Sequence, residues 1–352
     1  MKTAQAVAKS GLDVILAHAP APGGHADPFS YYRVERPANA RSVAISRALP
    51  APLDRIESNR LFALRLAKVV LAERPDAVLV RHIKLAALLR RRFPRLPIVY
   101  EAHEVFADTA ALARRARVER QEEAALRAAS AVIANSNGTA SRLAQRFGGT
   151  AKIEVIPNGV DWRSELPSKD WAGARKLIAY AGSLFPWKGV EDLVLASALL
   201  PGCTVTIAGG EPQEVEALRA RVSASGAQVV FLGRVDHASV QRLLGASCIA
   251  VLPNRADPES AFTSPLKLFE YMAAGCALVA SDLPALREIL DAGDASFVPA
   301  QEPQALASAI RALADDPGGA RRMGERLHEK ARRYSWDARG ERVAALLKRL
   351  CA

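Results

Sequence analysis

DPESAFTSPLKLFEYMAAGCALVASD, residues 257–282, predicts a helix that is followed at once by a buried strand. Ser264 suits the N-cap and Pro265 the first helical position, and Gly275 is a typical residue at which a helix ends. The apolar run of residues 276–282 is typical of a strand in a parallel sheet with both faces covered. A helix joined directly to such a strand indicates an α/β fold.

One carboxylate, Glu270, lies within this otherwise apolar helix. The residues that share its face at helical spacing are Leu266, Phe269 and Ala273. Because an unpaired carboxylate is costly to bury, we expect Glu270 to have a polar partner in the folded protein.

Length and composition indicate an ordinary globular protein with two domains. The chain has 352 residues, of which 50% are hydrophobic, and single cores seldom grow beyond about 250–300 residues. Its apolar runs are shorter than the roughly 20 residues that a membrane-spanning helix needs, and no signal peptide is predicted. The four cysteines lack the spacing of a metal site, which fits reduced thiols and a cytoplasmic location.

The net charge of +11 indicates an anionic partner, such as nucleic acid, an acidic membrane surface or a phosphorylated small molecule. Most arginines and lysines fall in clusters on predicted helices, without interleaved aromatic residues. Each cluster is explained either as a solvated helix face or as a surface for anionic lipid, and both explanations stay open. No motif supports nucleic-acid binding, so no nucleic-acid partner is predicted.

Short apolar segments alternate with amphipathic ones along the chain, which predicts parallel sheets covered by helices. The predicted strands are residues 13–19, 42–47, 77–81, 98–103, 131–135, 153–156, 177–181, 204–208, 228–232, 249–252, 277–280 and 296–298. The predicted helices are residues 56–73, 85–92, 112–129, 139–147, 190–200, 213–224, 238–244, 265–274, 283–290, 304–314, 318–333 and 337–350, with another over 2–10.

This alternation predicts two doubly wound, Rossmann-like domains, residues 1–161 and 162–334, followed by a last helix in 335–352. Residues 162–176 are predicted to link the domains, and residues 19–40 to form a loop. Because residues 2–10 read as the end of a helix, we expect the first strand of the first domain to precede Met1. Ligands are expected beside the carboxyl ends of the strands, between the two domains.

Three glycine-containing loops follow neighbouring predicted strands of the second domain. In residues 180–189 (YAGSLFPWKG), Gly182 lets a ligand approach the backbone, and Lys188 stands at a helix start, where phosphate is favoured. Gly209 with Gly210, and residues 231–235 (FLGRV), follow the next two strands. Each loop alone is as typical of any α/β fold, but their position at one sheet edge favours a shared site.

The predicted strand 98–103 leads into a polar cluster of Glu101, His103 and Glu104. Alternation along a strand places Glu101 and His103 on one face and Glu104 on the other. One histidine and two carboxylates on a single strand do not make a convincing metal site. We therefore predict that His103 points into the ligand site and hydrogen-bonds a hydroxyl group there.

Taken in order, these motifs resemble glycosyltransferase family 4, the group 1 retaining glycosyltransferases of the GT-B fold. The residues that carry the resemblance are Pro157-Asn-Gly-Val-Asp161, Gly182, Lys188-Gly189, Gly209-Gly210, Phe231-Leu-Gly233 and Ser264-Pro-Leu-Lys-Leu-Phe-Glu-Tyr-Met-Ala-Ala-Gly275. It covers nearly the whole chain. In this family a final helix after a Tyr-Ser-Trp segment, here residues 334–336, returns to the N-terminal domain.

The resemblance implies sugar transfer from a nucleotide-diphosphate sugar, with retention at the anomeric carbon and without a metal or other cofactor. By resemblance, the catalytic residues are His103, which contacts the transferred sugar, Lys188, which neutralises the diphosphate, and Glu270, which holds the ribose hydroxyls. The other residues expected to border the donor are Gly182, Ser183, Gly209, Gly233, Arg234, Val235, Ser264, Pro265 and Leu266.

Three departures from the family pattern limit this assignment. Phe262 stands eight residues before Glu270, where many members have a glutamate, and Ser183 replaces an arginine. The expected absence of the first strand is the third departure. We predict an enzyme on the inner membrane face that glycosylates a polysaccharide, a lipid-linked acceptor or another cell-surface glycan. The alternative is a non-catalytic nucleotide-sugar-binding partner protein.

Overall fold

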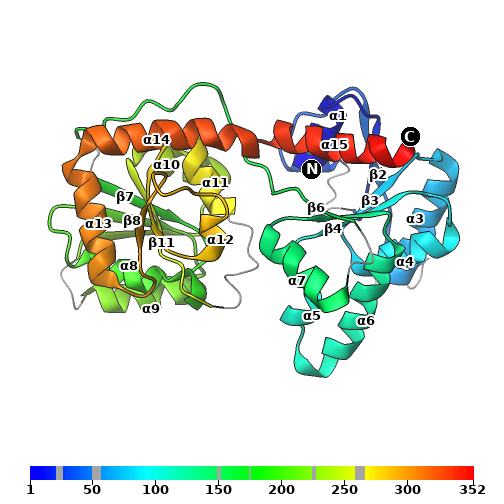
Figure 1. The fold of residues 1–352 in the computed structure, drawn as a ribbon, viewed down its shortest axis with the longest axis horizontal. Helices are drawn as coiled ribbons and strands as arrows, with labels where there is room; N and C mark the ends of the chain where they lie inside the picture. The colour runs from blue at the N-terminus through cyan, green and yellow to red at the C-terminus, as the bar shows by residue number, and fades with distance from the viewer. Residues whose placement is uncertain (21–26, 50–56, 149–151, 174–175, 224–226, 258–265) are drawn as a thin grey trace. The chain divides into compact units, whose positions relative to one another are not determined.

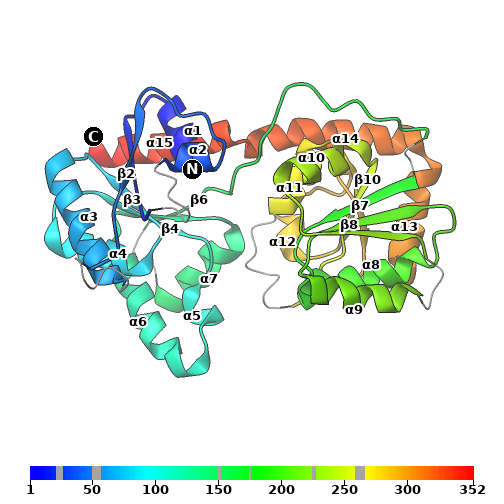
Figure 2. The same cartoon turned by 180° about the vertical axis from the view of Figure 1, so that it is seen from behind.

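The computed structural model describes residues 1–20, 27–49, 57–148, 152–173, 176–223, 227–257 and 266–352. The chain divides into two compact units (Figures 1 and 2). The first unit consists of Met1–Gly159 and Trp336–Ala352, and the second of Val160–Ser335. The first unit is therefore built from two separate pieces of chain.

The second unit is built around a six-stranded parallel sheet with the strand order β12-β11-β10-β7-β8-β9. This is the order of a doubly wound, Rossmann-like sheet, and it reverses between β7 and β10. In such sheets, ligands bind outside the carboxyl ends of the strands near the reversal. The strands are β7 (Leu177–Ala181), β8 (Thr204–Ala208), β9 (Val229–Gly233), β10 (Ile249–Leu252), β11 (Ala277–Ser281) and β12 (Ser296–Val298).

Helices cover both faces of this sheet. One layer contains α8 (Val190–Ser197), α9 (Pro212–Ser223) and α13 (Pro303–Asp315). The other contains α10 (His237–Ala246), α11 (Leu266–Ala273), α12 (Pro284–Arg287) and α14 (Pro317–Ala331), which leads into η5 (Arg332–Tyr334). Successive strand residues divide between the two cores: Ile178 packs with the first layer and Ala179 with the second.

The helix α11 confirms the predicted end at Gly275, whose φ of +65° is left-handed. The predicted inward face is wrong at Leu266, which is 38% exposed. Leu268 and Tyr271 are fully buried instead. The helix packs against both the sheet core and α14, so its buried surface is wider than a single stripe.

The predicted linker is residues 162–176, and its described part, residues 162–173, is held to the second unit by hydrogen bonds. Trp162 Nε1 donates to the carbonyl of His328 at 2.8 Å, and Lys169 Nζ donates to the carbonyl of Ser247 at 2.7 Å. These contacts leave two short passages between the units, at residues 159–160 and 335–336.

The two points at which the chain crosses between the units are joined by backbone pairing. Val160 and Ser335 form a parallel bridge, and the amide of Val160 donates to the carbonyl of Tyr334 at 2.9 Å. Gly159 lies against Trp336 so closely that a Cβ there would stand 2.5 Å from the indole ring. Residue 159 therefore has no room for a side chain.

The strands of the first unit form two separate parallel sheets. β1 (Val14–His18) pairs with β2 (Ala40–Ala44). β3 (Val78–Val80), β4 (Ile98–Ala102), β5 (Ala131–Ala134) and β6 (Ile153–Val155) pair in that order. One face of this second sheet packs on α3 (Asn59–Glu73), α4 (Ile83–Arg92), α6 (Leu112–Ala128) and α7 (Asn137–Phe147). The other face packs on α1 (Lys2–Lys9) and α15 (Trp336–Cys351).

Two one-turn helices of the first unit were not predicted. α2 (Pro28–Tyr31) lies in the stretch that the sequence predicts to be loop, and the Asp27 carboxylate caps it by accepting from the amide of Phe29. α5 (Phe106–Thr109) is held by the buried carboxylate of Glu122, which accepts from two of its amides at 2.9 Å. One turn is too short to show a helical period in the sequence.

Candidate functional site

Three loops meet at the carboxyl ends of β7, β8 and β9, as the sequence predicts. The amide of Gly182 donates to the carbonyl of Ala208 at 2.9 Å, and the amide of Gly209 to the carbonyl of Gly233 at 2.7 Å. Gly209 has a φ of +126°, and a Cβ there would lie 1.8 Å from the carbonyl oxygen of Gly182. Glycine at 209 is thus what allows the first two loops to touch.

A cavity of about 320 Å³ opens beside these loops. Five of the predicted donor residues line it: Gly182, Ser183, Gly209, Arg234 and Val235. The remaining lining residues are Phe185, Ala208, Gly210, Glu211, Glu214, Val240 and Lys267. A sixth predicted residue, Gly233, lines an adjacent cavity of about 440 Å³. The site therefore combines partly exposed glycine backbone with side chains of both charges.

Glu270 is buried on α11, with 7% of its surface exposed. Its expected polar partner is Lys267, which donates from Nζ to Oε2 at 2.9 Å and also lines the cavity. Oε1 of Glu270 has no hydrogen-bond partner among the described residues. Lys267 was not predicted as this partner, although its i,i+3 spacing from Glu270 on a helix is the signal that identifies it.

A buried tyrosine ties α11 to the strand that ends at the cavity. Tyr271 Oη accepts a hydrogen bond from the amide of Ala181 at 2.7 Å and donates one to its carbonyl at 3.1 Å. Burial raises the pKa of this phenol, so it keeps the proton that it donates. The sequence alone gave no signal for this role, because the two residues are 90 positions apart.

Lys188 lies in the half-buried turn η3 (Pro186–Lys188), directly before α8. Burial lowers the pKa of its ammonium, and no residue in the described part of the chain accepts a hydrogen bond from Nζ. Arg255 fixes the turn: its amide donates to the carbonyl of Trp187 at 2.9 Å, and its guanidinium pairs with both oxygens of Asp192 at 2.9 Å. Lys188 is thus a cation held in place without an anion of its own among those residues.

Not all of the predicted donor residues are brought together. Lys188, Leu266 and Glu270 do not line the cavity, although Glu270 is joined to it through Lys267. Ser264 and Pro265 lie outside the described residues, as does Phe262. Arg234 lines the cavity and forms an exposed ion pair with Glu211 at 2.9 Å, a contact that contributes little to stability.

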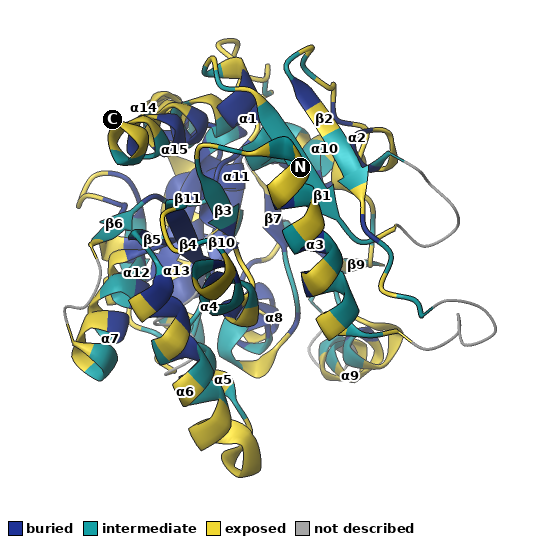
Figure 3. Ribbon diagram, turned by 90° about the vertical axis from the view of Figure 1, so that its right-hand side faces the viewer, coloured by how far each residue is buried: buried dark blue, intermediate teal, exposed yellow. Residues whose placement is uncertain are grey.

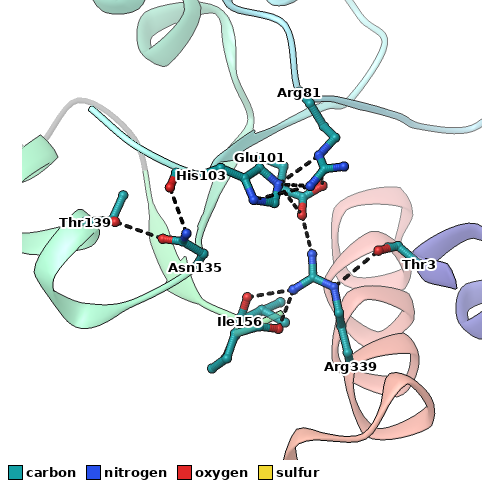
Figure 4. A network of polar contacts seen from close by, with 9 residues as sticks. Thr3, Arg81, Glu101, His103, Asn135, Thr139, Ile156 and Arg339 are labelled. Atoms are coloured by element: carbon teal, nitrogen blue, oxygen red, sulfur yellow. Dashed lines mark hydrogen bonds and ion pairs between the residues drawn. The ribbon is translucent and has the colours of Figure 1, made fainter. Parts of the chain in front are cut away.

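His103 belongs to the first unit and directly follows β4 (Figure 4). The predicted common face of Glu101 and His103 is confirmed, because Nε2 of the ring lies 3.0 Å from Oε1 of Glu101. Glu104 points elsewhere and accepts from Thr109 Oγ1 at 3.1 Å. The carbonyl of His103 accepts from Asn135 Nδ2 at 2.7 Å, which fixes the backbone beneath the ring.

Over the described residues, no group of three His, Cys, Asp or Glu side chains is arranged to hold a metal ion. None of the helices in the same part of the chain is both long enough and apolar enough to cross a membrane.

Two family models match the chain. Residues 1–163 match "Glycosyltransferase Family 4", and residues 175–316 match "Glycosyl transferases group 1". Glycogen synthase of Mycobacterium tuberculosis is 31% identical over 278 residues, 73% of this chain and 64% of the synthase. The phosphatidyl-myo-inositol mannosyltransferase of Mycolicibacterium smegmatis is 31% identical over 195 residues, 51% of this chain and 48% of that protein. The chain thus spans less than two thirds of these relatives.

Solved structures share the fold at lower sequence identity. Sucrose-phosphate synthase of Thermosynechococcus elongatus superposes with a TM-score of 0.76 at 21% identity, covering 99% of this chain and 92% of that one. The Anabaena protein HepE in complex with UDP gives a TM-score of 0.72 at 21% identity, covering 96% and 99%. Both units, each an α/β layer structure, agree with the GT-B fold. The chain belongs to the group 1 glycosyltransferases of family 4.

Proposed function

We propose that this protein is a retaining glycosyltransferase that uses a nucleotide-diphosphate sugar and needs no metal or other cofactor. The observation that carries the proposal is the cavity at the carboxyl ends of β7, β8 and β9, where glycine backbone and Lys267 meet. β7 is one of the two strands between which the sheet order reverses. Parallel α/β sheets bind nucleotides at this position, because backbone amides there face the phosphates.

The proposed roles follow from the charge that develops during transfer. When the bond between the anomeric carbon and the diphosphate oxygen breaks, the leaving group gains negative charge. Lys188 is suited to stabilise it, because its half-buried ammonium lacks a partner among the described residues. Glu270 would hold the ribose hydroxyls through Oε1, while Lys267 donates a hydrogen bond to Oε2 from the other side.

Other contacts are assigned by the family resemblance. The backbone of Ser264, Pro265 and Leu266 would add to the diphosphate site, and the turn of residues 233–235 would border the base. His103 would contact the transferred sugar. Because Ser183 replaces the arginine of the family, we expect Lys188 to carry more of the phosphate charge.

The acceptor is proposed to be a polysaccharide, a lipid-linked saccharide or another cell-surface glycan. Two relatives support this choice, since one is named for glycogen and the other for a phosphatidylinositol. We also propose that the protein works in the cytoplasm on the inner membrane face. The net charge of +11 supports contact with anionic lipid, and vesicle binding tests it.

The donor proposal is tested with UDP-, GDP-, ADP- and CDP-sugars. We expect one nucleotide class to raise the melting temperature, because a ligand that binds only the folded state stabilises it. Lys188→Ala and Glu270→Gln should each lower the transfer or donor-hydrolysis rate by about 100- to 1,000-fold, the usual loss for one transition-state contact. Lys176→Ala is the matched control, since it removes an exposed lysine at the opposite end of β7.

The outcomes separate three cases. Turnover that both variants lose supports the enzyme. Binding without turnover in the wild type favours the alternative of a non-catalytic nucleotide-sugar-binding partner protein, for which Ser183 is the supporting observation. A melting temperature that no donor changes would rule out the nucleotide-sugar site itself.

A further inference from the structure

Arg339 on α15 is among the most deeply buried charged residues of the described chain, with 3% of its surface exposed. Its guanidinium donates to the carbonyl oxygens of Ile156, at 2.8 Å, and Pro157, to Oγ1 of Thr3 at 3.3 Å, and to Oε1 of Glu101 (Figure 4). Burial lowers the pKa of this guanidinium, and the Glu101 carboxylate opposes that effect. All three nitrogens of the guanidinium thus donate hydrogen bonds to residues of the first unit.

Glu101 connects this arginine to the histidine at the strand end. Its carboxylate is 2% exposed, and the same oxygen that receives Arg339 lies 3.0 Å from Nε2 of His103. Burial alone would raise the pKa of Glu101, but the hydrogen bond from His103 and the charges of Arg339 and Arg81 lower it to about 2. A carboxylate in this state only accepts hydrogen bonds.

The acceptor character of Glu101 selects one tautomer of His103. A neutral ring that donates from Nε2 to Glu101 presents Nδ1 as an acceptor for another group. Arg81 competes for this ring as a donor: its Nε lies 2.8 Å from the same Nε2, and its Nη2 contacts Nε2 and lies 3.2 Å from Nδ1. The Arg81 side chain is 60% exposed, so its contact is weak, whereas the buried carboxylate requires its donors.

Packing alone does not account for such a group of charges. A buried ion pair contributes no more to stability than well-packed apolar residues of similar size. What this pair does provide is a fixed carboxylate directly beneath His103, held by a helix that lies 238 residues further along the chain. The pair of Arg339 and Glu101 therefore accounts for how the imidazole ring of His103 is oriented.

We propose that Arg339 is a positioning residue for glycosyl transfer: it holds Glu101 and thereby fixes the orientation and tautomer of His103. This rests on the proposed function, in which His103 contacts the transferred sugar. The C-terminal helix α15 then serves the site through one side chain, in addition to covering the sheet.

The test compares Arg339→Met, Arg339→Gln and Arg339→Lys in the full chain. Two-dimensional ¹H–¹⁵N spectra of ¹⁵N-histidine-labelled protein report the tautomer of each of the six histidines, and a His103→Gln variant assigns the signal. We expect Arg339→Met and Arg339→Gln to shift the His103 ring signals and to lower kcat by up to about 100-fold, as misplacement of a reacting group does. The affinity for the free nucleoside diphosphate, which lacks the sugar, should stay the same, because the cavity proposed for it lies in the second unit.

Arg342→Met is the matched control. Arg342 stands nearly one turn further along α15 and also donates to a backbone carbonyl, that of Val155, but it does not touch Glu101. We expect it to leave the His103 signals and kcat unchanged, and Arg339→Lys to restore part of both, because its ammonium can still reach the carboxylate. Circular dichroism confirms that each variant is folded, and Arg339→Gln replaces Arg339→Met if the latter is not.

Unchanged His103 signals in a folded Arg339→Met or Arg339→Gln variant would overturn the positioning role, as would a kcat equal to that of the wild type. A wild type that binds donor but transfers no sugar would contradict the proposed function only. In that case a shifted His103 signal in the variants still supports the link from Arg339 to the ring, and an unshifted one still refutes it.

Discussion

Glu101 shows what a single side chain can contribute to the stability of the first unit. Its pKa of about 2 lies well below the value of 4.5 that is usual for a glutamate. A carboxylate with a depressed pKa stabilises the folded state above its unfolded-state pKa, and this contribution is lost as pH falls toward the folded-state value. The window for Glu101 is therefore pH 4.5 down to about 2.

Glu101→Gln should accordingly destabilise the protein most at neutral pH. The loss in the free energy of unfolding is expected to be on the order of 3 kcal/mol above pH 4.5, and to shrink as the solution becomes more acidic. Urea unfolding at several pH values, followed by circular dichroism, measures the difference. Glu104→Gln is the control, since the Glu104 carboxylate accepts a hydrogen bond from Thr109 near the surface and forms no ion pair within the described residues. A difference that is the same at every pH would contradict the assigned cause.

Residue by residue, the sequence was informative where partners are close in the chain. Because Glu270 lies in an otherwise apolar helix, a polar partner was predicted for it, and that partner, Lys267, is three residues away. The partner of Glu101 could not be predicted, because Arg339 meets it only after two distant segments have folded together. The role of Tyr271 is hidden for the same reason.

Most helices and strands were predictable because alternation and helical spacing are local. β7, β8, β10 and β12 have the predicted ends, and the other strands differ by a few residues. The division of the first unit into two sheets was not predicted. Strand pairing depends on contacts between distant segments, on which the pattern within one strand carries little information.

The start of α6 suits the proposed contact with anionic lipid. Residues 111–117 are all exposed, as Figure 3 shows for the first turns of this helix, and Leu112 is 81% exposed. Arg114, Arg115 and Arg117 lie in these turns without an acidic neighbour in them. Such basic turns with an exposed leucine favour an acidic membrane surface over open solvent.

Replacing these three arginines by glutamine should weaken binding to vesicles of phosphatidylserine and phosphatidylcholine by roughly 100-fold, at about 1 kcal/mol for each charge. Vesicle sedimentation at fixed ionic strength measures it, with pure phosphatidylcholine vesicles as the lipid control. A matched triple change of the exposed Arg91, Arg92 and Arg95 should have a smaller effect. Equal losses in both triple variants would place the attraction in the overall charge rather than in α6.

At the scale of the whole molecule, the two units differ in whether one continuous segment of the chain forms the unit. The second unit is continuous and contains both of its cores, whereas a core of the first unit includes Val343 and Leu346 from α15. A fragment of residues 160–335 should therefore fold alone, and residues 1–159 should not.

Circular dichroism and thermal unfolding of the two fragments test this asymmetry. The nucleotides UDP, GDP, ADP and CDP should raise the melting temperature of the 160–335 fragment with the same order of preference as that of the full chain. The reason is that all lining residues of the cavity belong to this fragment. Adding a peptide of residues 336–352 to residues 1–159 should restore part of their structure. A cooperative transition of residues 1–159 alone would contradict the expected dependence on α15.

The bridge between Val160 and Ser335 pairs the first and the last residue of the second unit. In genetic terms the second unit is an insertion at one point of the first, and recombination at two codons could exchange it as a single cassette. A chimaera made at these joints would change the nucleotide preference while keeping the host's Arg339, Glu101 and His103 together. Gly159 sets the condition for such an exchange, because the incoming joint must still fit beside Trp336.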